Sequence, residues 1–332
     1  MKTKFIRTFQ QGGQGFGVYL MNNTLQEDVD RFFVSFYNSF GFRSHLEKNW
    51  FNWFYTQNPD GLCNNYILVD LDSSRWIGGF GFGKKRYLVD GAEVCGALAV
   101  NGYINSGYEG RGLYTELIKT VLDNEMLSDR IAFSFPHGNN IPSIKGHIKN
   151  GWVNYVALQF LDINVRKVEP DVPEVKITNN IDALHRFDFN QVNKGDGFCF
   201  VRTAEHLKWR FFERPDKEYT LLTMVTDGKT EGYMFLTKYK TKEGILRCQI
   251  ADWGYASQEI LLKLIDKARF AGSQMGCHIL DVLINPDALS VKFFYAKGFL
   301  ARAEGYQLLT YSKANRQLPL AAEVTYADFD VI

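Results

Sequence analysis

The sequence predicts an α/β (α+β) chain of two similar units in tandem, each with helices flanking a mixed sheet. Two observations lead to this fold class. Motifs of the first half recur in the second half at matching spacings, and short strand-like runs alternate with longer helical patterns. A length of 332 residues also suits two domains. Apolar residues make up 45% and charged residues 23%, as in globular proteins, which excludes a disordered or fibrous class.

The internal repeat has two pairs of anchors. Segment 53–60 recurs as segment 209–216, with a tryptophan and a proline at the same spacing. Segment 143–152 recurs as segment 290–299, with Ser-x-Lys and a later Gly-aromatic pair in the same places. Several matches in one order are not expected by chance, so we interpret the chain as a duplication.

Between the anchors both halves show the same predicted order, α-α-β-β-β-α-β-α-β. The predicted strands are short, β-branched or aromatic, and bounded by Gly, Asn or Asp. The predicted helices repeat apolar residues every three or four positions, as Ile118, Val121 and Leu122 do. Strands are expected at 66–69, 77–82, 94–104, 131–135, 219–222, 232–236, 245–252 and 279–284, and long helices at 113–127 and 259–271.

The join between the halves is expected at 166–176, which contains two prolines and several charges. This composition is typical of a linker. It predicts an N-terminal unit of residues 1–168 and a C-terminal unit of residues 169–332.

Charge and cysteine usage indicate compartment and partners. A net charge of +1 argues against a dedicated nucleic-acid surface. No apolar stretch is long enough to span a membrane, and the first residues lack the apolar segment of a signal peptide. The five cysteines never form C-x-x-C, so buried free thiols are expected rather than metal ligands or disulfides. We expect a cytoplasmic chain without a metal site.

Segment 104–115 joins a predicted strand to a predicted helix and contains Gly110 and Gly112. Glycines there let backbone N–H groups point at an anion beside the positive end of the helix dipole. A plain strand-to-helix turn is the alternative. Thr115 stands where the dinucleotide fingerprint has its third glycine, and no Gly-Lys-Ser/Thr follows, so neither a dinucleotide site nor a P-loop is predicted.

At this point the sequence resembles the GNAT (Gcn5-related N-acetyltransferase) superfamily. The acyl-CoA diphosphate loop of that family and the strand before it are matched by Ile104, Ser106, Tyr108, Gly110, Arg111, Gly112 and Leu113. A second family signature, N-x-x-A-x-x-x-Y-x-x-x-G-F, is matched by Asn140, Ser143, His147, Gly151 and Trp152. The resemblance covers both halves and implies two tandem GNAT-like units, each with a mixed, mostly antiparallel sheet.

The resemblance implies that acyl-CoA is the co-substrate, either acetyl-CoA or a longer or hydroxylated acyl-CoA, and that no metal is used. The implied cofactor-binding residues are Tyr103, Ile104, Gly110, Arg111, Gly112, Leu113, Tyr114, Thr115 and Asn140. Backbone N–H groups near Tyr103 and Ile104 would hold the thioester oxygen. Asn140 would meet the pantetheine amides, or would cap the next helix.

Four positions depart from the family pattern. Glu109 stands where Arg or Gln is usual, and Tyr114 stands where Gly or Ala is usual. His147 replaces the tyrosine that commonly protonates the leaving thiolate, and Leu98 falls about where many members carry a catalytic Glu. The usual base is therefore absent from its usual place, so the mechanism does not transfer whole.

The second half lacks the loop. Its matching run at 255–260 has no glycine, and Phe294 occupies the place of His147. We therefore expect one acyl-CoA per chain, with the second unit helping to form the acceptor pocket.

Two histidines are the catalytic candidates. His147 falls on the apolar side of a predicted helix, and an imidazole with a pKa of about 6.5 can donate to a thiolate or accept from an ammonium. A buried structural histidine is the alternative. His137 follows the strand 131–135 at its carboxyl end, where ligands of α/β sheets commonly lie, with a surface residue as the alternative.

Five residues are candidates for binding the second substrate. Lys85 and Arg86 belong to a basic run and Arg43 lies between the first two helices, so each is suited to a nucleotide diphosphate. Asp252 and Trp253 end a strand of the second half, where Asp would accept from an ammonium and Trp would stack on a ring. Packing, capping or solvation is the alternative for all five.

Segments 53–59 and 108–114 look like those of bacterial GNAT members that acylate the amine of a dTDP- or UDP-linked amino sugar for surface polysaccharides. The resemblance implies an acyl-CoA-dependent N-acyltransferase in which the amine attacks the thioester directly. The alternatives are N-acetylation of an aminoglycoside, peptide or cell-wall precursor amine, and a non-catalytic acyl-CoA-binding module. The sugar, the acyl chain, the base and the oligomeric state stay open.

Overall fold

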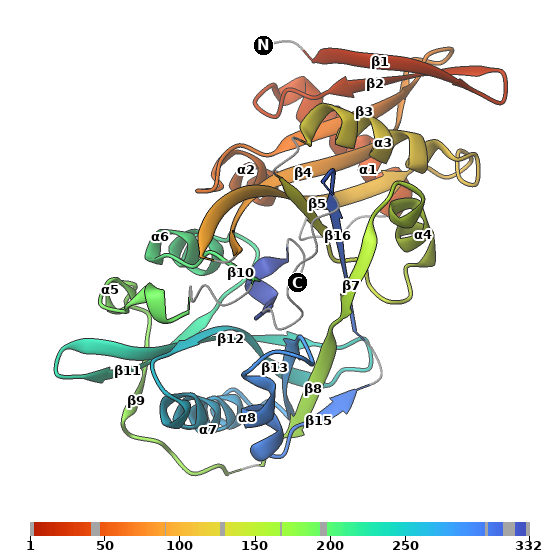
Figure 1. The fold of residues 1–332 in the computed structure, drawn as a ribbon. Helices are drawn as coiled ribbons and strands as arrows, with labels where there is room; N and C mark the ends of the chain where they lie inside the picture. The colour runs from red at the N-terminus through yellow and green to blue at the C-terminus, as the bar shows by residue number, and fades with distance from the viewer. Residues whose placement is uncertain are drawn as a thin grey trace. The chain divides into compact units, whose positions relative to one another are not determined.

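The computed structural model describes residues 3–40, 47–89, 91–126, 130–166, 168–192, 198–302, 305–314 and 323–329. The chain divides into two compact units (Figure 1). Unit 1 comprises Met1–Arg86, Val94–Tyr155 and Gln307–Gln317, and unit 2 comprises Tyr87–Glu93, Val156–Tyr306 and Leu318–Ile332. Each contains a mixed sheet flanked by helices, which confirms the predicted fold class.

The sheet of unit 1 has the strand order β1-β2-β3-β4-β5-β6-β16-β7. Its strands are β1 (Lys4–Gln11), β2 (Gln14–Leu20), β3 (Asn64–Asp70), β4 (Arg75–Val89), β5 (Ala92–Ile104), β6 (Ile131–Ser134), β7 (Val153–Ala157) and β16 (Gln307–Ser312). The helices are α1 (Gln26–Phe40), α2 (Lys48–Thr56), α3 (Leu113–Glu125) and α4 (Ile141–Lys149). Strands β1 to β4 are antiparallel to their neighbours, whereas β5 and β6 run parallel.

The hairpin of β1 and β2 is absent from the predicted elements. Gly12 and Gly13 form its turn with φ values of 60° and 79°, the positive pair that a two-residue type I′ turn requires. Phe9 and Phe16 are paired across the two strands, with ring centroids 5.6 Å apart. A Gly-Gly pair between two strand-like runs is a hairpin signal, so the sequence did contain the information.

Helix α3 covers one face of this sheet (Figure 1). Its apolar side chains Leu113, Leu117 and Val121 are buried against Phe80 of β4 and Ala99 of β5. Full burial of a leucine or valine side chain contributes roughly 1.5–3 kcal/mol. This packing holds the start of α3 beside the end of β5.

The opposite face of the sheet carries an aromatic cluster from α1 and α2. Phe51 and Tyr55 of α2 stack with centroids 4.4 Å apart, and Phe32 of α1 lies 6.1 Å from the ring of Tyr103 on β5. All four rings are buried. Because side chains alternate along a strand, Tyr103 points to this cluster while Gly102 faces α3 and α4.

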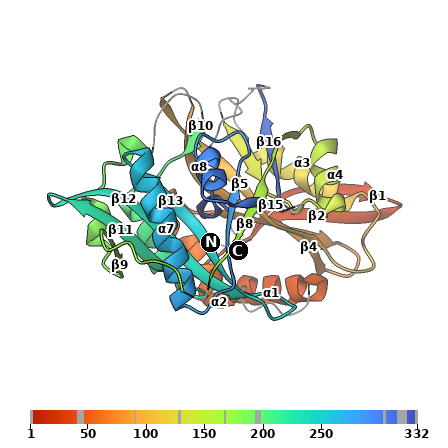
Figure 2. The same ribbon diagram turned by 90° about the horizontal axis from the view of Figure 1, so that it is seen from below.

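The sheet of unit 2 has the order β15-β8-β14-β13-β12-β11-β9. Its strands are β8 (Gln159–Asn164), β9 (Val175–Thr178), β11 (Thr220–Thr226), β12 (Lys229–Lys240), β13 (Leu246–Tyr255), β14 (Ile279–Ile284) and β15 (Leu300–Arg302), and a short β10 (Phe198–Phe200) pairs with residues 87–89 of β4. The helices are α5 (Asp182–His185), α6 (Ala204–Leu207), α7 (Gln258–Gln274) and α8 (Val291–Ala296), with single turns at Phe189–Gln191, Lys208–Phe212 and Tyr326–Asp328. Helix α7 lies across β11 to β13 (Figure 2) and buries Leu261, Leu264 and Ile265.

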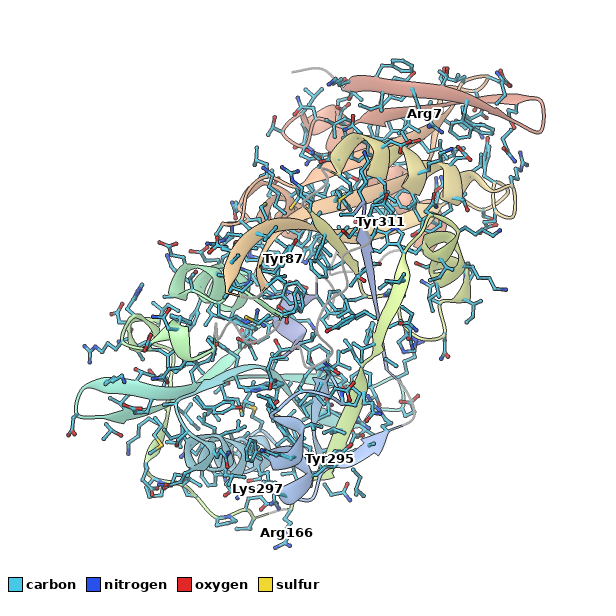
Figure 3. The ribbon with its side chains drawn as sticks, viewed as in Figure 1. Arg7, Tyr87, Arg166, Tyr295, Lys297 and Tyr311 are labelled. Atoms are coloured by element: carbon cyan, nitrogen blue, oxygen red, sulfur yellow. The ribbon has the colours of Figure 1, made fainter. Side chains whose placement is uncertain are left out.

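The two sheets exchange strands between the halves of the chain. Strand β16 lies between β6 and β7 in unit 1, and β8 lies in the matching place between β14 and β15 in unit 2. On β16, Tyr311, labelled in Figure 3, packs against Trp152 with centroids 5.8 Å apart. The chain therefore leaves unit 1 after Tyr155 and returns for Gln307–Gln317, unlike the expected division after residue 168. The residues of a strand determine which of its faces is apolar, but they do not determine which of two sheets the strand joins.

Candidate functional site

Unit 1 contains a cavity of about 650 Å³ at the carboxyl end of β5. Its walls are the last residues of β5, the loop after β5, the first turn of α3, and α4. The structure brings all but one of the predicted cofactor-binding residues together here. Those lining the cavity are Tyr103, Ile104, Gly110, Gly112, Leu113, Tyr114, Thr115 and Asn140.

Strand β5 has a bulge just before the cavity. Asn101 has a φ of 50°, which is uncommon for a residue other than glycine. Its Nδ2 donates to Tyr55 Oη at 2.9 Å, and Val100 also faces Tyr55, next to Gly81. Consecutive residues of a regular strand point to opposite faces, so the shared face of Val100 and Asn101 marks a β-bulge.

Strand β5 also extends beyond the end of its parallel neighbour β6. The two strands pair only as far as Ala99 and Ser134, where β6 ends, whereas β5 continues to Ile104. Among the described residues, β6 therefore offers no partner to residues 101–104 of β5. An unpaired strand edge beside a cavity presents N–H and C=O groups to an extended ligand.

The loop after β5 turns at glycines and leads to an uncapped helix. Gly107, Gly110 and Gly112 have φ values of 86°, 73° and 77°. Gly112 is the N-cap of α3 and has no side chain to bond the first N–H groups of the helix. In unit 2, by contrast, Ser257 caps α7 by accepting from the N–H of Ile260. The start of α3 is therefore suited to an anion, and the start of α7 is already satisfied.

Arg111 is the predicted cofactor-binding residue that does not line the cavity. Its Nη2 donates to the carbonyl of Gly107 at 2.7 Å and its Nη1 donates to Gln14 at 3.2 Å. The guanidinium also lies 5.1 Å from the ring centroid of Tyr108, whose hydroxyl donates to Asp70 at 2.7 Å. Arg111 therefore holds the loop in shape.

Tyr114 extends from α3 between β5 and α4. A Cβ atom at Gly102 would lie 2.4 Å from Tyr114 Oη, and one at Gly146 would lie 2.6 Å from its ring. Both glycines are thus required for the ring to fit. Burial raises the pKa of Tyr114 to about 12, against a hydrogen bond with Ser143 that lowers it, so the phenol is protonated at neutral pH.

His147 lies in the core and does not line the cavity. Its Nδ1 is 2.8 Å from the carbonyl oxygen of Ser143, so Nδ1 carries the proton and donates it there. Its Nε2 has no hydrogen-bond partner among the described residues. The rings of Phe80, Tyr114 and Trp152 surround the imidazole, and burial lowers the pKa of His147 to about 4. The expected inward-facing position is found, but a neutral, enclosed imidazole gives the expected proton transfer no support.

His137 and Asn140 belong to the loop between β6 and α4. His137 Nδ1 accepts from the N–H of Asn139 at 3.2 Å, which holds the turn, and the histidine does not line the cavity. Asn140 caps α4 by accepting from the N–H of Ser143 at 3.4 Å, and it also lines the cavity. Both interpretations of Asn140 are therefore compatible with its place.

The predicted substrate-binding residues of unit 1 are not gathered at the cavity. Arg43 lies outside the described residues. Lys85 is buried within β4. Arg86 donates from Nε to Asp60 at 2.7 Å and from its backbone N–H at 3.1 Å, so it ties β4 to the end of the repeated segment 53–60. Neither Lys85 nor Arg86 lines the cavity.

Asp252 and Trp253 lie inside unit 2. Asp252 is 0% exposed and accepts from Arg202 at 3.1 Å and from Thr325 Oγ1 at 2.6 Å. Trp253 is buried with its ring 5.4 Å from that of Phe294. An enclosed and fully bonded carboxylate contradicts the expectation that Asp252 accepts from a substrate ammonium, and burial in the core does the same for the stacking expected of Trp253.

The cavity is also lined by residues that the sequence reasoning did not select, among them Gly102, Lys145 and Lys149. Lys145 and Lys149 stand one turn apart on α4, a spacing that places both on one face of a helix, so the pattern could have been found. Gly102 had no sequence signal, because its importance comes from Tyr114, which reaches it from another element.

Two features bear on metal and membrane chemistry. Within the described ranges, no three His, Cys, Asp or Glu side chains come together in an arrangement able to hold a metal ion. None of the described helices has the length and apolar character needed to cross a membrane. All five cysteines are free, and all but Cys95 are buried.

Comparison with known proteins reveals likeness in structure. No family model matches the chain, and no curated protein matches its sequence. Saccharomyces cerevisiae N-myristoyltransferase with bound myristoyl-CoA matches with a TM-score of 0.65 and 9% identity, over 96% of this chain and 91% of that protein.

Two other solved structures are similar. A GCN5-related N-acetyltransferase from Anabaena variabilis matches with a TM-score of 0.63 and 13% identity, over 89% of this chain and 72% of that one. A probable N-acyltransferase from Enterococcus faecalis matches with a TM-score of 0.66 and 12% identity, over 90% and 72%. The chain therefore has the GNAT fold, shared with these N-acyltransferases, as its sequence resemblance implies.

Proposed function

We propose that this chain is an acyl-CoA-dependent N-acyltransferase that acylates the primary amine of a dTDP- or UDP-linked amino sugar for surface polysaccharide synthesis. One observation carries the acyl-CoA part: a single cavity joins the uncapped start of α3 to the unpaired end of β5. The fold shared with N-acyltransferases supports the reaction class. The amino-sugar part is based on the resemblance of segments 53–59 and 108–114.

The residues present fit a diphosphate-bearing donor. A Cβ atom at Gly110 would project into open space, so the loop backbone is bare on that side. The first N–H groups of α3 and the positive end of its dipole favour an anion there. Lys145 and Lys149 add positive charge on the wall formed by α4. Glu109 is exposed at the rim of the cavity.

The unpaired end of β5 fits the thioester end of the same donor. When bound, acyl-CoA supplies an activated acyl group. The N–H groups of Gly102 and Ile104 are the candidate donors to its carbonyl oxygen, because Asn105 donates to Ile77 of β4 and successive N–H groups of a strand point to opposite edges. The bulge at Asn101 holds that stretch of backbone in place before reaction. Fixed donors of this kind need no reorganisation during the reaction.

We place one acyl-CoA site in the chain, in unit 1. Ser257 already satisfies the start of α7, and Phe294 is buried at the place that matches His147. Unit 2 is proposed to contribute to the acceptor pocket. Free cysteines agree with a cytoplasmic compartment, where thiols stay reduced.

Calorimetric titration with CoA, followed by a product screen, tests the proposal. We expect one equivalent of CoA per chain, and CoA release when acetyl-CoA or a 3-hydroxyacyl-CoA is mixed with a dTDP- or UDP-linked amino sugar. No uptake of CoA, or two equivalents, contradicts the donor site. Transfer to other amines but never to a nucleotide sugar contradicts the sugar assignment and leaves the acyltransferase.

One observation favours a second candidate function, an acyl-CoA-binding module without catalysis. Neither His137 nor His147 lines the cavity, so none of the histidines that the structure describes stands there as a base. The same titration separates the two functions. A module binds CoA but releases none from acetyl-CoA with any amine in the screen.

A further inference from the structure

The hydroxyl of Tyr114 lies against the part of β5 that extends beyond the end of β6. Its Oη occupies the space over Gly102, the residue after the bulge at Asn101, and its ring passes over Gly146 of α4. Of the β5 residues that line the cavity, Gly102 is nearest to the bulge and farthest along the chain from the glycine loop. Tyr114 therefore reaches from the start of α3 to the inner end of the cavity.

Other phenols at the cavity are placed differently. Tyr103 is buried, with its ring among the side chains of α1, 5.1 Å from that of Phe36. Tyr108 donates its proton to Asp70 at 2.7 Å. Tyr114 is half-buried and lines the cavity, and its phenol oxygen accepts a hydrogen bond from the hydroxyl of Ser143. Its own proton is therefore available to a group in the cavity.

His147 is unsuited to give a proton to that place. Its Nδ1 proton is used by the carbonyl of Ser143, and its Nε2 is unprotonated and enclosed by aromatic rings. With a pKa of about 4, the imidazolium is rare at neutral pH. Burial raises the pKa of Tyr114 to about 12, so its phenol, unlike the imidazole, carries a transferable proton at neutral pH.

We propose that Tyr114 is the acid that protonates the leaving sulfur of the acyl donor, an inference that rests on the proposed function. The amine nitrogen bonds to the acyl carbon, the carbon–sulfur bond breaks, and its electron pair stays on sulfur. The Oη proton of Tyr114 moves to that sulfur, giving a neutral thiol. The proton lost by the nitrogen goes to solvent, and the phenolate regains one from solvent, so protons and charge balance.

Tyr114→Phe tests this assignment, because phenylalanine keeps the ring between Gly102 and Gly146 and removes the hydroxyl. The donors are acetyl-CoA and its oxygen-ester analogue, and the acceptor is hydroxylamine, a small neutral amine. An alkoxide is a far stronger base than a thiolate, so its departure depends more on an acid. We expect kcat to fall about 10²-fold with acetyl-CoA and about 10⁴-fold with the oxygen ester, with the KM of each donor nearly unchanged.

Two matched variants complete the experiment. Tyr19→Phe removes a hydroxyl from β2, three strands from β5 in the sheet, and is expected to leave both rates unchanged. His147→Phe is expected to change the rates with both donors by one common factor.

The proposal is overturned if Tyr114→Phe lowers kcat by the same factor with both donors. It is also overturned if His147→Phe lowers kcat by a different factor with each donor. An unmodified chain that cleaves acetyl-CoA but never the oxygen ester lacks a positioned acid and also overturns it. These outcomes leave the acyltransferase function standing. If the unmodified chain cleaves neither donor with hydroxylamine or with any amine of the product screen, including the nucleotide-linked amino sugars, the proposed function itself fails.

Discussion

Arg202 is only 5% exposed. Its positive charge is neutralised by Asp252 and Asp328, with N–O distances of 3.1 Å and 2.7 Å. Thr325 bonds both to the guanidinium and to Asp252. Removing one partner of a buried ion pair costs about 3–5 kcal/mol, because the remaining charge loses its compensation. At the scale of the residue, burial thus assigns Asp252 to the stability of unit 2.

We expect Asp252→Asn to lower the free energy of unfolding by about 2 kcal/mol, less than for an isolated pair because Asp328 still faces Arg202. Urea denaturation measures the change. Asp266→Asn, which breaks the more exposed 2.6 Å pair with Lys297, is the control and should cost less than about 1 kcal/mol. Unchanged stability with lost acyl transfer would return Asp252 to substrate binding.

The acid sensitivity of His147 gives a second prediction. The unfolded chain takes up a proton on this imidazole below about pH 6.5, whereas burial lowers the pKa in the folded chain to about 4. Protons therefore favour unfolding between these values, and the stability contributed by His147 is complete above pH 6.5 and is lost as the pH falls toward 4.

The His147→Phe variant should accordingly lose less stability in acid. Between pH 7 and pH 4, its unfolding free energy should fall by up to about 3 kcal/mol less than that of the unmodified chain. Denaturant titrations at several pH values measure the difference. Parallel pH curves for the two chains would show that the imidazole is already solvated in the folded state.

At the scale of the element, the start of α3 separates unit 1 from unit 2. Gly112 ends the loop with a left-handed φ and leaves the N–H groups of the first turn for the cavity, whereas Ser257 bonds to the matching turn of α7. Both helices have a similar apolar face and both lie against their sheets. The start of α3, which is suited to an anion, therefore differs from the start of α7 in the preceding loop and in the N-cap residue.

Gly112→Val is expected to raise the KM for acyl-CoA at least about 10-fold, because a branched side chain enters the cavity and opposes the φ of 77°. Gly107→Val is the matched control: it has a φ of 86° and the same strain, of about 1–2 kcal/mol, but does not line the cavity. Steady-state kinetics with acetyl-CoA compares them. Similar KM values in both variants would mean that strain, and not the approach of the donor, causes the effect.

At the scale of the whole molecule, the exchange of strands means that each unit needs residues from both halves of the chain to complete its sheet. Strand β16, near the end of the chain, completes the sheet of unit 1 between β6 and β7. Its residue Leu309 is buried in the core of that unit. Cutting the chain at the linker expected from the sequence would thus remove a central part of unit 1.

A fragment of residues 1–168 should therefore fail to fold cooperatively, because it lacks Gln307–Ser312 and exposes the edges of β6 and β7. Circular dichroism during urea titration checks this. Co-expression with residues 169–332 should restore a folded complex that retains CoA binding. Cooperative unfolding of the fragment alone, at the stability of the full chain, would contradict the structural importance of the exchange.

The sequence by itself determined the features that depend on neighbours along the chain. These are the duplication, the long helices, the glycine turn at Gly110 and Gly112, and the loss of that turn in the second half, and most of the predicted cofactor-binding residues do meet at one cavity. Helix periodicity and positive φ are local properties, so a sequence pattern records them.

Only the tertiary structure decided which sheet receives β16, that Tyr114 reaches Gly102, and that His147 and Asp252 are enclosed. Each of these depends on atoms brought together from distant parts of the chain. Packing and desolvation act on that three-dimensional neighbourhood, and the same imidazole or carboxylate behaves as a catalyst in a cavity and as a structural group in a core.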